Sequence, residues 1–170
     1  MSHYETLNFP GRVLVVEDDP MIIALFQRWF SWHHELELVG ASGAQEALRL
    51  WRESDFDLLL TDIELDGMNG VELAIEARRE RPDAAIALMT AHASVDYATQ
   101  AVRATVNDFI EKPLDKVDIC GRVLALVAEV QKRRAGAGRT VLAAGAHPDD
   151  VEPRWNENSC AITHVSCCSK

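Results

Sequence analysis

The chain has 170 residues, of which 48% are hydrophobic, and a formal net charge of −10 at pH 7. This length suits one compact domain with an appendage or two small domains, and the acidic charge argues against nucleic acid or an anionic membrane as a partner. The sequence contains no run of about 20 apolar residues, as a transmembrane helix needs, and it does not begin with a secretory pattern. We therefore expect a cytoplasmic protein.

Short apolar runs and helical patterns alternate from about residue 11 to residue 134. The first run ends in acidic residues, as is typical of a buried parallel strand, and Pro20 then stands where a helix can begin. In chain order, strands are predicted at 13–16, 36–39, 58–60, 84–89 and 108–110, and helices at 20–29, 43–51, 71–79, 95–102 and 114–134. This alternation predicts an α/β fold with a doubly wound parallel sheet.

Polar side chains follow four of the predicted strands. They are Glu17, Asp18 and Asp19 after the first strand, Asp62 after the third, Thr90 after the fourth and Lys112 after the fifth. Ligands of such sheets bind at the carboxyl ends of the strands, so we expect these side chains to converge. Crowded carboxylates need a cation, and oxygen ligands suit Mg²⁺. Each residue alone is also an ordinary turn or helix-cap residue, but together they predict Mg²⁺-dependent phosphoryl transfer to a carboxylate.

Four segments carry a resemblance to a known family. They are Val13–Pro20 (VLVVEDDP), Leu60–Leu65 with Gly67–Gly70, Met89–Ala91 and Phe109–Pro113. Together they closely resemble response-regulator receiver domains, over residues 11–134. The resemblance implies a flavodoxin-like fold with five strands in the order 2-1-3-4-5.

The resemblance also implies roles for the strand-end residues. Asp62 is the expected phosphoacceptor, with a sensor histidine kinase or a phosphotransfer protein as donor. Glu17 and Asp18 are expected to hold Mg²⁺ together with Asp62 and the backbone carbonyl of Glu64. Asp19 is expected to support the metal site from outside or to cap a helix. Such a chain is a phosphoacceptor signalling domain, not an enzyme.

A switch is the second implication of the resemblance. Thr90 and Lys112 would contact the phosphoryl group, and Phe109 occupies the position of the switch aromatic, with a plain buried aromatic as the alternative. Movement of these residues would change the face formed by the fourth helix, fifth strand and fifth helix, which could support a homodimer. Glu64 and His92 flank the site and are candidates for tuning the lifetime of the phosphoryl group. Apolar residues available for this face are Ala98, Val102 and Ala104.

The pattern changes after Arg134. Residues 135–139 read as a flexible linker, and residues 140–152 read as a strand-like run that ends in His-Pro-Asp-Asp-Val-Glu. This end resembles the start of PIG-L/LmbE deacetylases, which implies His147 and Asp150 as zinc ligands and Asp149 as general base. A polar turn in a disordered tail is the alternative.

Only 18 residues follow Glu152, too few for the rest of a deacetylase domain. We therefore expect residues 140–170 to be a truncated deacetylase-like segment or a disordered tail. Zinc is expected only if a complete domain were present.

Cysteine and basic residues add little. Cys120 is predicted to be a small core residue, and the remaining cysteines suggest neither a disulfide framework nor a metal site. The basic run at residues 132–134 is most simply the solvated end of a helix. No helix-turn-helix pattern follows the fifth helix, which argues against a transcription factor.

Overall fold

The computed structural model describes residues 10–91 and 104–143. Five strands form one sheet: β1 (Gly11–Val16), β2 (Leu36–Ala41), β3 (Leu58–Asp62), β4 (Ala85–Thr90) and β5 (Asp108–Glu111). Their order is β2-β1-β3-β4-β5, and every neighbouring pair is parallel. The predicted doubly wound, flavodoxin-like sheet is therefore confirmed.

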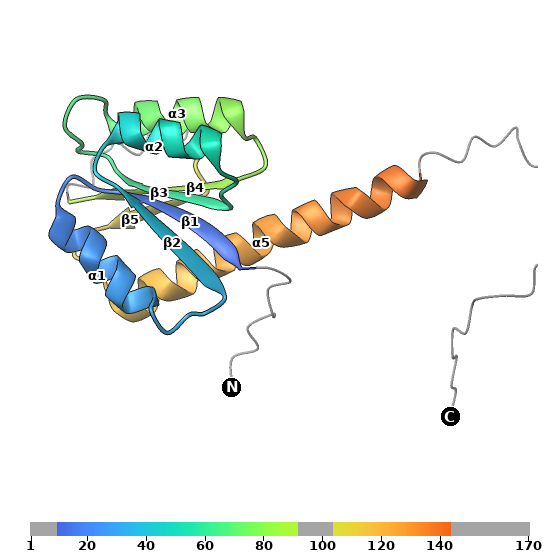
Figure 1. Cartoon of the computed structure of the whole chain (residues 1–170), viewed down its shortest axis with the longest axis horizontal. Helices are drawn as coiled ribbons and strands as arrows, with labels where there is room; N and C mark the ends of the chain where they lie inside the picture. Colours follow the sequence, from blue (N-terminus) through green and yellow to red (C-terminus); the bar gives the residue numbers. More distant parts are fainter. Residues whose placement is uncertain (1–9, 92–103, 144–170) are drawn as a thin grey trace, which may run out of the picture.

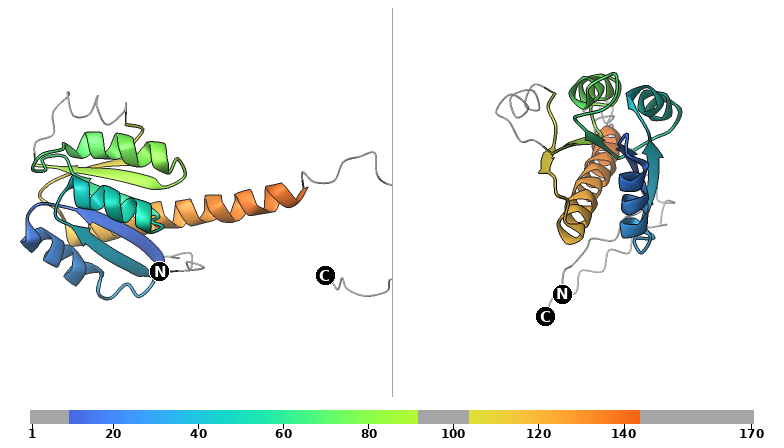
Figure 2. Two further views of the ribbon diagram at one scale, coloured as in Figure 1. Left: turned by 45° about the horizontal axis from the view of Figure 1, so that its top comes forward. Right: turned by 90° about the vertical axis from the view of Figure 1, so that its left-hand side faces the viewer.

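Helices cover both faces of the sheet (Figures 1 and 2). On one face lie α2 (Ala44–Glu53) and α3 (Gly70–Glu80), and on the other lie α1 (Pro20–Phe30) and α5 (Lys116–Ala143). Each face has its own apolar core, with Trp51 and Leu59 in one and Phe26 and Val127 in the other. Because β3 and β4 face a core on both sides, every residue in them is buried. The predicted helix at 95–102, with Ala98 and Val102, lies outside the described residues.

Side chains at the helix starts explain where α1 and α3 begin. Asp19 accepts a hydrogen bond from the backbone N–H of Met21 at 2.8 Å, and Pro20 occupies the first helical position. Asn69 accepts one from the backbone N–H of Val71 at 2.7 Å. Of the two roles expected for Asp19, the structure thus has the helix cap.

The last helix differs from its prediction. Helix α5 continues unbroken from Lys116 to Ala143 and projects beyond the sheet, as Figure 1 shows. Residues 135–139, predicted as a flexible linker, are therefore helical, and so are residues 140–143 at the start of the predicted strand-like run. The rest of that run lies outside the described residues. Glycine weakens a helix by only about 1 kcal/mol, and each residue added to an existing helix gains a hydrogen bond. Residues 132–134 consequently lie inside a helix and not at its end.

A partly buried ion pair ties α5 to the amino-terminal end of the sheet. Asp57 immediately precedes β3, and its carboxylate accepts hydrogen bonds from Arg134 Nη1 at 2.6 Å and from the backbone N–H of Arg12 at 3.0 Å. The Nε atom of Arg134 also donates to Asp83 at 2.6 Å. Cys120 belongs to α5 and is buried in the core on that face of the sheet, as predicted, and burial raises the pKa of its thiol.

No helix among residues 10–91 and 104–143 has the length and apolar character needed to cross a membrane.

Candidate functional site

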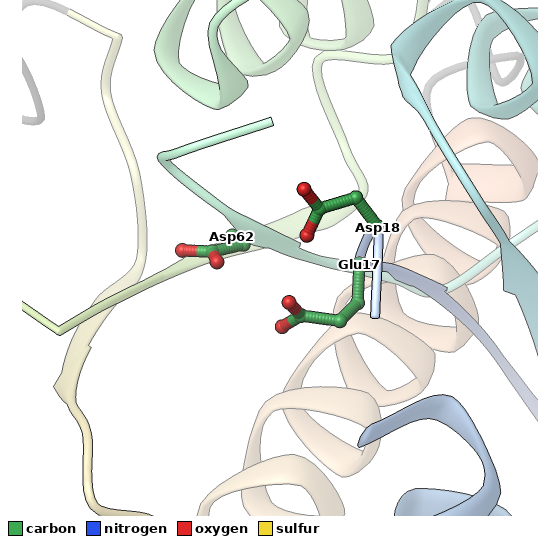
Figure 3. Close-up of side chains that lie close together, drawn as sticks. All are labelled: Glu17, Asp18 and Asp62. Atoms are coloured by element: carbon green, nitrogen blue, oxygen red, sulfur yellow. The ribbon is translucent and has the colours of Figure 1, made fainter. Parts of the chain in front are cut away.

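Three carboxylates meet at the carboxyl-terminal edge of the sheet (Figure 3). Glu17 and Asp18 directly follow β1, and Asp62 is the last residue of β3. One oxygen of each lies within 4.8 Å of one oxygen of the other two. Glu17 and Asp62 are only 2% and 6% exposed, whereas Asp18 is exposed. The cluster therefore combines a buried floor with one side open to solvent.

Lys112 supplies the positive charge in this cluster. Its Nζ atom donates hydrogen bonds to Glu17 Oε2 and to Asp62 Oδ2, both at 2.8 Å. Burial disfavours the ammonium form, but the hydrogen bonds to the two carboxylates outweigh it and raise the pKa of Lys112. Lys112 thus remains charged and pairs with both buried carboxylates at once.

Among the residues that the structure describes, one ammonium faces three carboxylates and does not balance their charge. Burial raises the pKa of Glu17, the hydrogen bond from Lys112 opposes this rise, and the charges of Asp62 and Asp18 add to it. Oxygen donors with excess negative charge and an open side fit a hard divalent cation that keeps part of its water shell. The residues present therefore suit Mg²⁺.

The backbone places these groups through the register of parallel strands. The N–H of Glu17 donates to the carbonyl of Ala41 at 3.1 Å, and the N–H of Ile63 donates to the carbonyl of Met89 at 2.9 Å. These bonds continue the backbone pairing one residue past β1 and β3, so the backbone of Glu17 and Asp62 is held at the edge of the sheet. Glu64 follows in the loop after β3, and its N–H donates to Asp62 Oδ1 at 3.4 Å. Glu64 therefore lies next to the cluster, as predicted.

Thr90 and Phe109 lie on the two strands beside Asp62. Thr90 is the last residue of β4 and is fully buried, and its carbonyl accepts a hydrogen bond from the N–H of Lys112 at 2.7 Å. Phe109 lies in β5 opposite Leu88 and is only partly buried against the core of α2 and α3. The structure thus links Thr90 and Lys112 through the backbone, with Phe109 three residues before Lys112.

Several predicted residues fall outside the described part of the chain. His92 belongs to the segment after β4, and His147, Asp149 and Asp150 belong to the segment after α5. Cys160, His164, Cys167 and Cys168 also lie outside the described residues. The deacetylase-like segment, and zinc with it, stays a prediction.

Sequence reasoning missed the part played by Gly70. In the sequence this glycine stands just before the predicted helix at 71–79 and has no role assigned to it, whereas the structure places it as the first residue of α3, buried against the backbone of Asp62. The available signal was the spacing, since a glycine eight residues after the expected phosphoacceptor opens a predicted helix.

The comparisons with known proteins agree with this geometry. Residues 13–124 match the family model described as response regulator receiver domain. Among solved structures, a CheY-like receiver domain protein from Methanospirillum hungatei superposes with a TM-score of 0.69 at 28% identity, covering 72% of this chain and 98% of that one. The response regulator TrrA from Thermotoga maritima, solved in complex with Mg²⁺-BeF, gives a TM-score of 0.62 at 29% identity, covering 68% and 98%.

Curated relatives extend well beyond the matched region. Response regulator protein PilR from Pseudomonas aeruginosa is 33% identical over 123 residues, which is 72% of this chain and 26% of PilR. Transcriptional regulatory protein GlrR from Escherichia coli is 32% identical over 107 residues, which is 63% of this chain and 24% of GlrR. The chain thus spans about a quarter of the length of these relatives, and its similarity to them concerns their receiver region.

Proposed function

We propose that this chain, which belongs to the response regulator receiver domain family, accepts a phosphoryl group on Asp62. One observation carries the proposal: a buried carboxylate at the end of β3 lies beside two further carboxylates and within 2.8 Å of the Lys112 ammonium. A carboxylate can act as a nucleophile toward phosphorus, and a cationic side chain can hold the phosphoryl oxygens.

In the proposed reaction, an oxygen of Asp62 attacks the phosphorus of the donor. An acyl phosphate bond forms, the bond from phosphorus to the donor breaks, and the leaving group keeps the electron pair and takes up a proton from water. Lys112 exchanges its contact with Asp62 Oδ2 for a phosphoryl oxygen, so its charge stays paired. The donor we propose is a phosphohistidine of a sensor histidine kinase or of a phosphotransfer protein.

We assign a divalent cation, Mg²⁺, to Glu17, Asp18 and Asp62, with the backbone carbonyl of Glu64 as a further oxygen ligand. When bound, Mg²⁺ neutralises negative charge on the phosphoryl oxygens. The donor set supports this assignment because three clustered carboxylates face one ammonium. The relative TrrA, solved with Mg²⁺-BeF, gives it independent support.

We further propose a switch that starts at Thr90 and Lys112. A phosphoryl group adds roughly −1.5 to −2 charges, which attract the hydroxyl of Thr90 and the ammonium of Lys112. Because the N–H of Lys112 is bonded to the carbonyl of Thr90, the ends of β4 and β5 shift together. Phe109, only partly buried in β5, then changes its packing, and the face of β5 and α5 changes for a partner or a second copy.

Nucleic acid is the other class of partner to consider, besides the phosphoryl donor. From the acidic charge of the chain we expect no nucleic-acid partner, whereas the relative GlrR is described as a transcriptional regulatory protein. Since this chain matches only about a quarter of GlrR, DNA binding does not follow for it from that similarity.

The test is labelling with a small phosphoryl donor such as phosphoramidate in the presence of Mg²⁺. Wild-type chain should take up one phosphoryl group that hydroxylamine releases, as an acyl phosphate requires, and Asp62→Ala should take up none. Asp66→Ala removes an exposed carboxylate from the same loop and should label like wild type. Labelling that survives in Asp62→Ala would overturn the assignment.

The switch has its own measurement. Beryllofluoride with Mg²⁺ should change backbone hydrogen exchange in residues 104–112 of the wild type and leave it unchanged in Asp62→Ala. Equal exchange with and without beryllofluoride, in protein that binds it, contradicts the switch and leaves the phosphoacceptor assignment intact.

A further inference from the structure

Gly70 lies directly against the peptide of the proposed phosphoacceptor. A β-carbon at residue 70 would overlap the carbonyl oxygen of Asp62, and it would lie 2.8 Å from the carbonyl carbon of Asp62 and 3.0 Å from the Cα atom of Ile63. Both neighbours are backbone at the end of a buried strand, so they cannot move aside like a flexible side chain. At Gly121, by contrast, a β-carbon would meet no atom within 4 Å. Gly70 therefore permits a backbone approach that no other residue allows.

Hydrogen bonds use this close approach to close a short loop. The N–H of Gly70 donates to the carbonyl of Ile63 at 3.0 Å, and the N–H of Leu65 donates to the same carbonyl at 3.2 Å. The hydroxyl of Thr61 donates to the carbonyl of Asp62 at 2.9 Å. Ile63 and Leu65 are buried, which fixes the loop on the core. The backbone from Thr61 to Gly70 is thus anchored to the sheet at one end and to α3 at the other.

The closed loop carries two of the proposed ligand groups. The carboxylate of Asp62 stands at its start, and the carbonyl of Glu64 lies two residues later. Mg²⁺ requires near-ideal octahedral geometry with short bonds to oxygen, so small displacements of its ligands weaken binding. A β-carbon at residue 70 would push α3 and this loop apart, and both ligand groups would move with the loop.

We infer that Gly70 is a positioning residue, whose missing side chain lets α3 hold Asp62 and the Glu64 carbonyl where they bind the divalent cation. This inference rests on the proposed function. Gly70 touches neither the cation nor the phosphoryl group and acts only through the backbone of Asp62 and Ile63.

The experiment measures Mg²⁺ affinity by calorimetry on the full chain, together with urea unfolding and phosphoramidate labelling. Gly70→Ala should weaken Mg²⁺ binding by about tenfold or more, as found when groups that orient metal ligands are removed. Labelling at low Mg²⁺ should fall in proportion and recover in part at high Mg²⁺. Gly121→Ala should match wild type in all three measurements.

A second control separates positioning from stability. Asn69→Ala removes the cap of α3 without placing a carbon against Asp62, so it should lower the urea midpoint and keep the wild-type Mg²⁺ affinity. A purely structural role for Gly70 would give Gly70→Ala the same behaviour as Asn69→Ala. Folded Gly70→Ala that binds Mg²⁺ within twofold of wild type overturns the inference.

Thr61→Val decides the matter if Gly70→Ala does not fold. It keeps the side-chain volume but removes the hydroxyl that holds the Asp62 carbonyl, so Mg²⁺ binding should weaken by about two- to tenfold. Unchanged binding in this variant overturns the inference. If the wild-type chain neither binds Mg²⁺ nor becomes labelled, the proposed function itself is refuted, whatever the variants do.

Discussion

Two aspartates at opposite ends of β3 are equally buried and have opposite surroundings. Asp57, just before the strand, and Asp62, at its end, are both 6% exposed. Asp57 pairs with Arg134 and with the backbone N–H of Arg12. Asp62 pairs with Lys112 but shares it with Glu17 and lies beside Asp18. Burial alone therefore does not distinguish a structural carboxylate from a reactive one.

The balance of charge makes the distinction. The guanidinium of Arg134 is planar and donates from fixed directions, so Asp57 has its partners in place whatever else binds. Asp62 belongs to a group in which negative charge exceeds positive charge, and such a group stores unfavourable repulsion until a cation binds. The first arrangement stabilises the fold, and the second is the one to which we assign the cation and the phosphoryl group.

The largest expected difference is between removing one aspartate and removing the other. Asp62→Ala should abolish labelling and leave the free energy of unfolding within about 1 kcal/mol of wild type, because it also relieves repulsion with Glu17 and Asp18. Phosphoramidate labelling and urea titration of the same preparation measure both quantities. If Asp62→Ala lowers the free energy of unfolding as much as Asp57→Ala does, both aspartates stabilise the fold and the contrast between them is wrong.

Asp57→Ala should have the reverse effect. It leaves Arg134 Nη1 and the Arg12 N–H without their acceptor, so the free energy of unfolding should fall by about 2–3 kcal/mol. Labelling of the folded protein at Asp62 should stay at the wild-type level. Asp55→Ala is the control, because the Asp55 side chain that pairs with Arg81 is 91% exposed and its loss should cost below about 1 kcal/mol. A fall in labelling of folded Asp57→Ala would mean that the two ends of β3 are coupled.

Lys112→Ala should affect the phosphoryl group more than the cation. Loss of a charge-assisted hydrogen bond corresponds to roughly 10- to 100-fold weaker binding of beryllofluoride at saturating Mg²⁺. Mg²⁺ affinity should not fall, since removing the ammonium leaves the carboxylates without a competing cation. Lys116→Ala, an exposed lysine at the start of α5, should leave both affinities unchanged. Weaker Mg²⁺ binding in Lys112→Ala would show that Lys112 orders the carboxylates instead of competing for them.

Arg134→Lys should give the smallest effect. Arg134 binds Asp57 and Asp83 with different nitrogens, and a lysine ammonium cannot reach both in the same way. The free energy of unfolding should drop by about 1 kcal/mol, with labelling unchanged. Arg133→Lys alters an exposed pair with Glu129 at 3.9 Å and should stay within about 0.5 kcal/mol of wild type. If the two variants are equally stable, the ion pair between Arg134 and Asp57 depends only on charge and not on the geometry of the guanidinium.

The sequence by itself determined the order of the elements and the edge at which the site lies. Alternating apolar runs and helical patterns suffice for this, because every strand of a parallel sheet ends at the same edge. Glu17, Asp18, Asp62 and Lys112 could therefore be expected together. The predicted end of α5 at residue 134 was wrong. Gly136 and Gly138 suggest a break there, but a helix that has already formed continues through them to Ala143.

Only the tertiary structure decided how the buried charges are paired. The sequence holds acids before and after β3, and nothing in their spacing tells which of them finds a full set of partners. Arg134 reaches Asp57 across 77 residues because α5 lies along the sheet in one particular register. Lys112 reaches Asp62 and Glu17 for the same kind of reason, and Gly70 meets the Asp62 peptide only once α3 has packed. Contacts of this kind depend on distances between elements, which packing sets to a fraction of an ångström and local sequence does not encode.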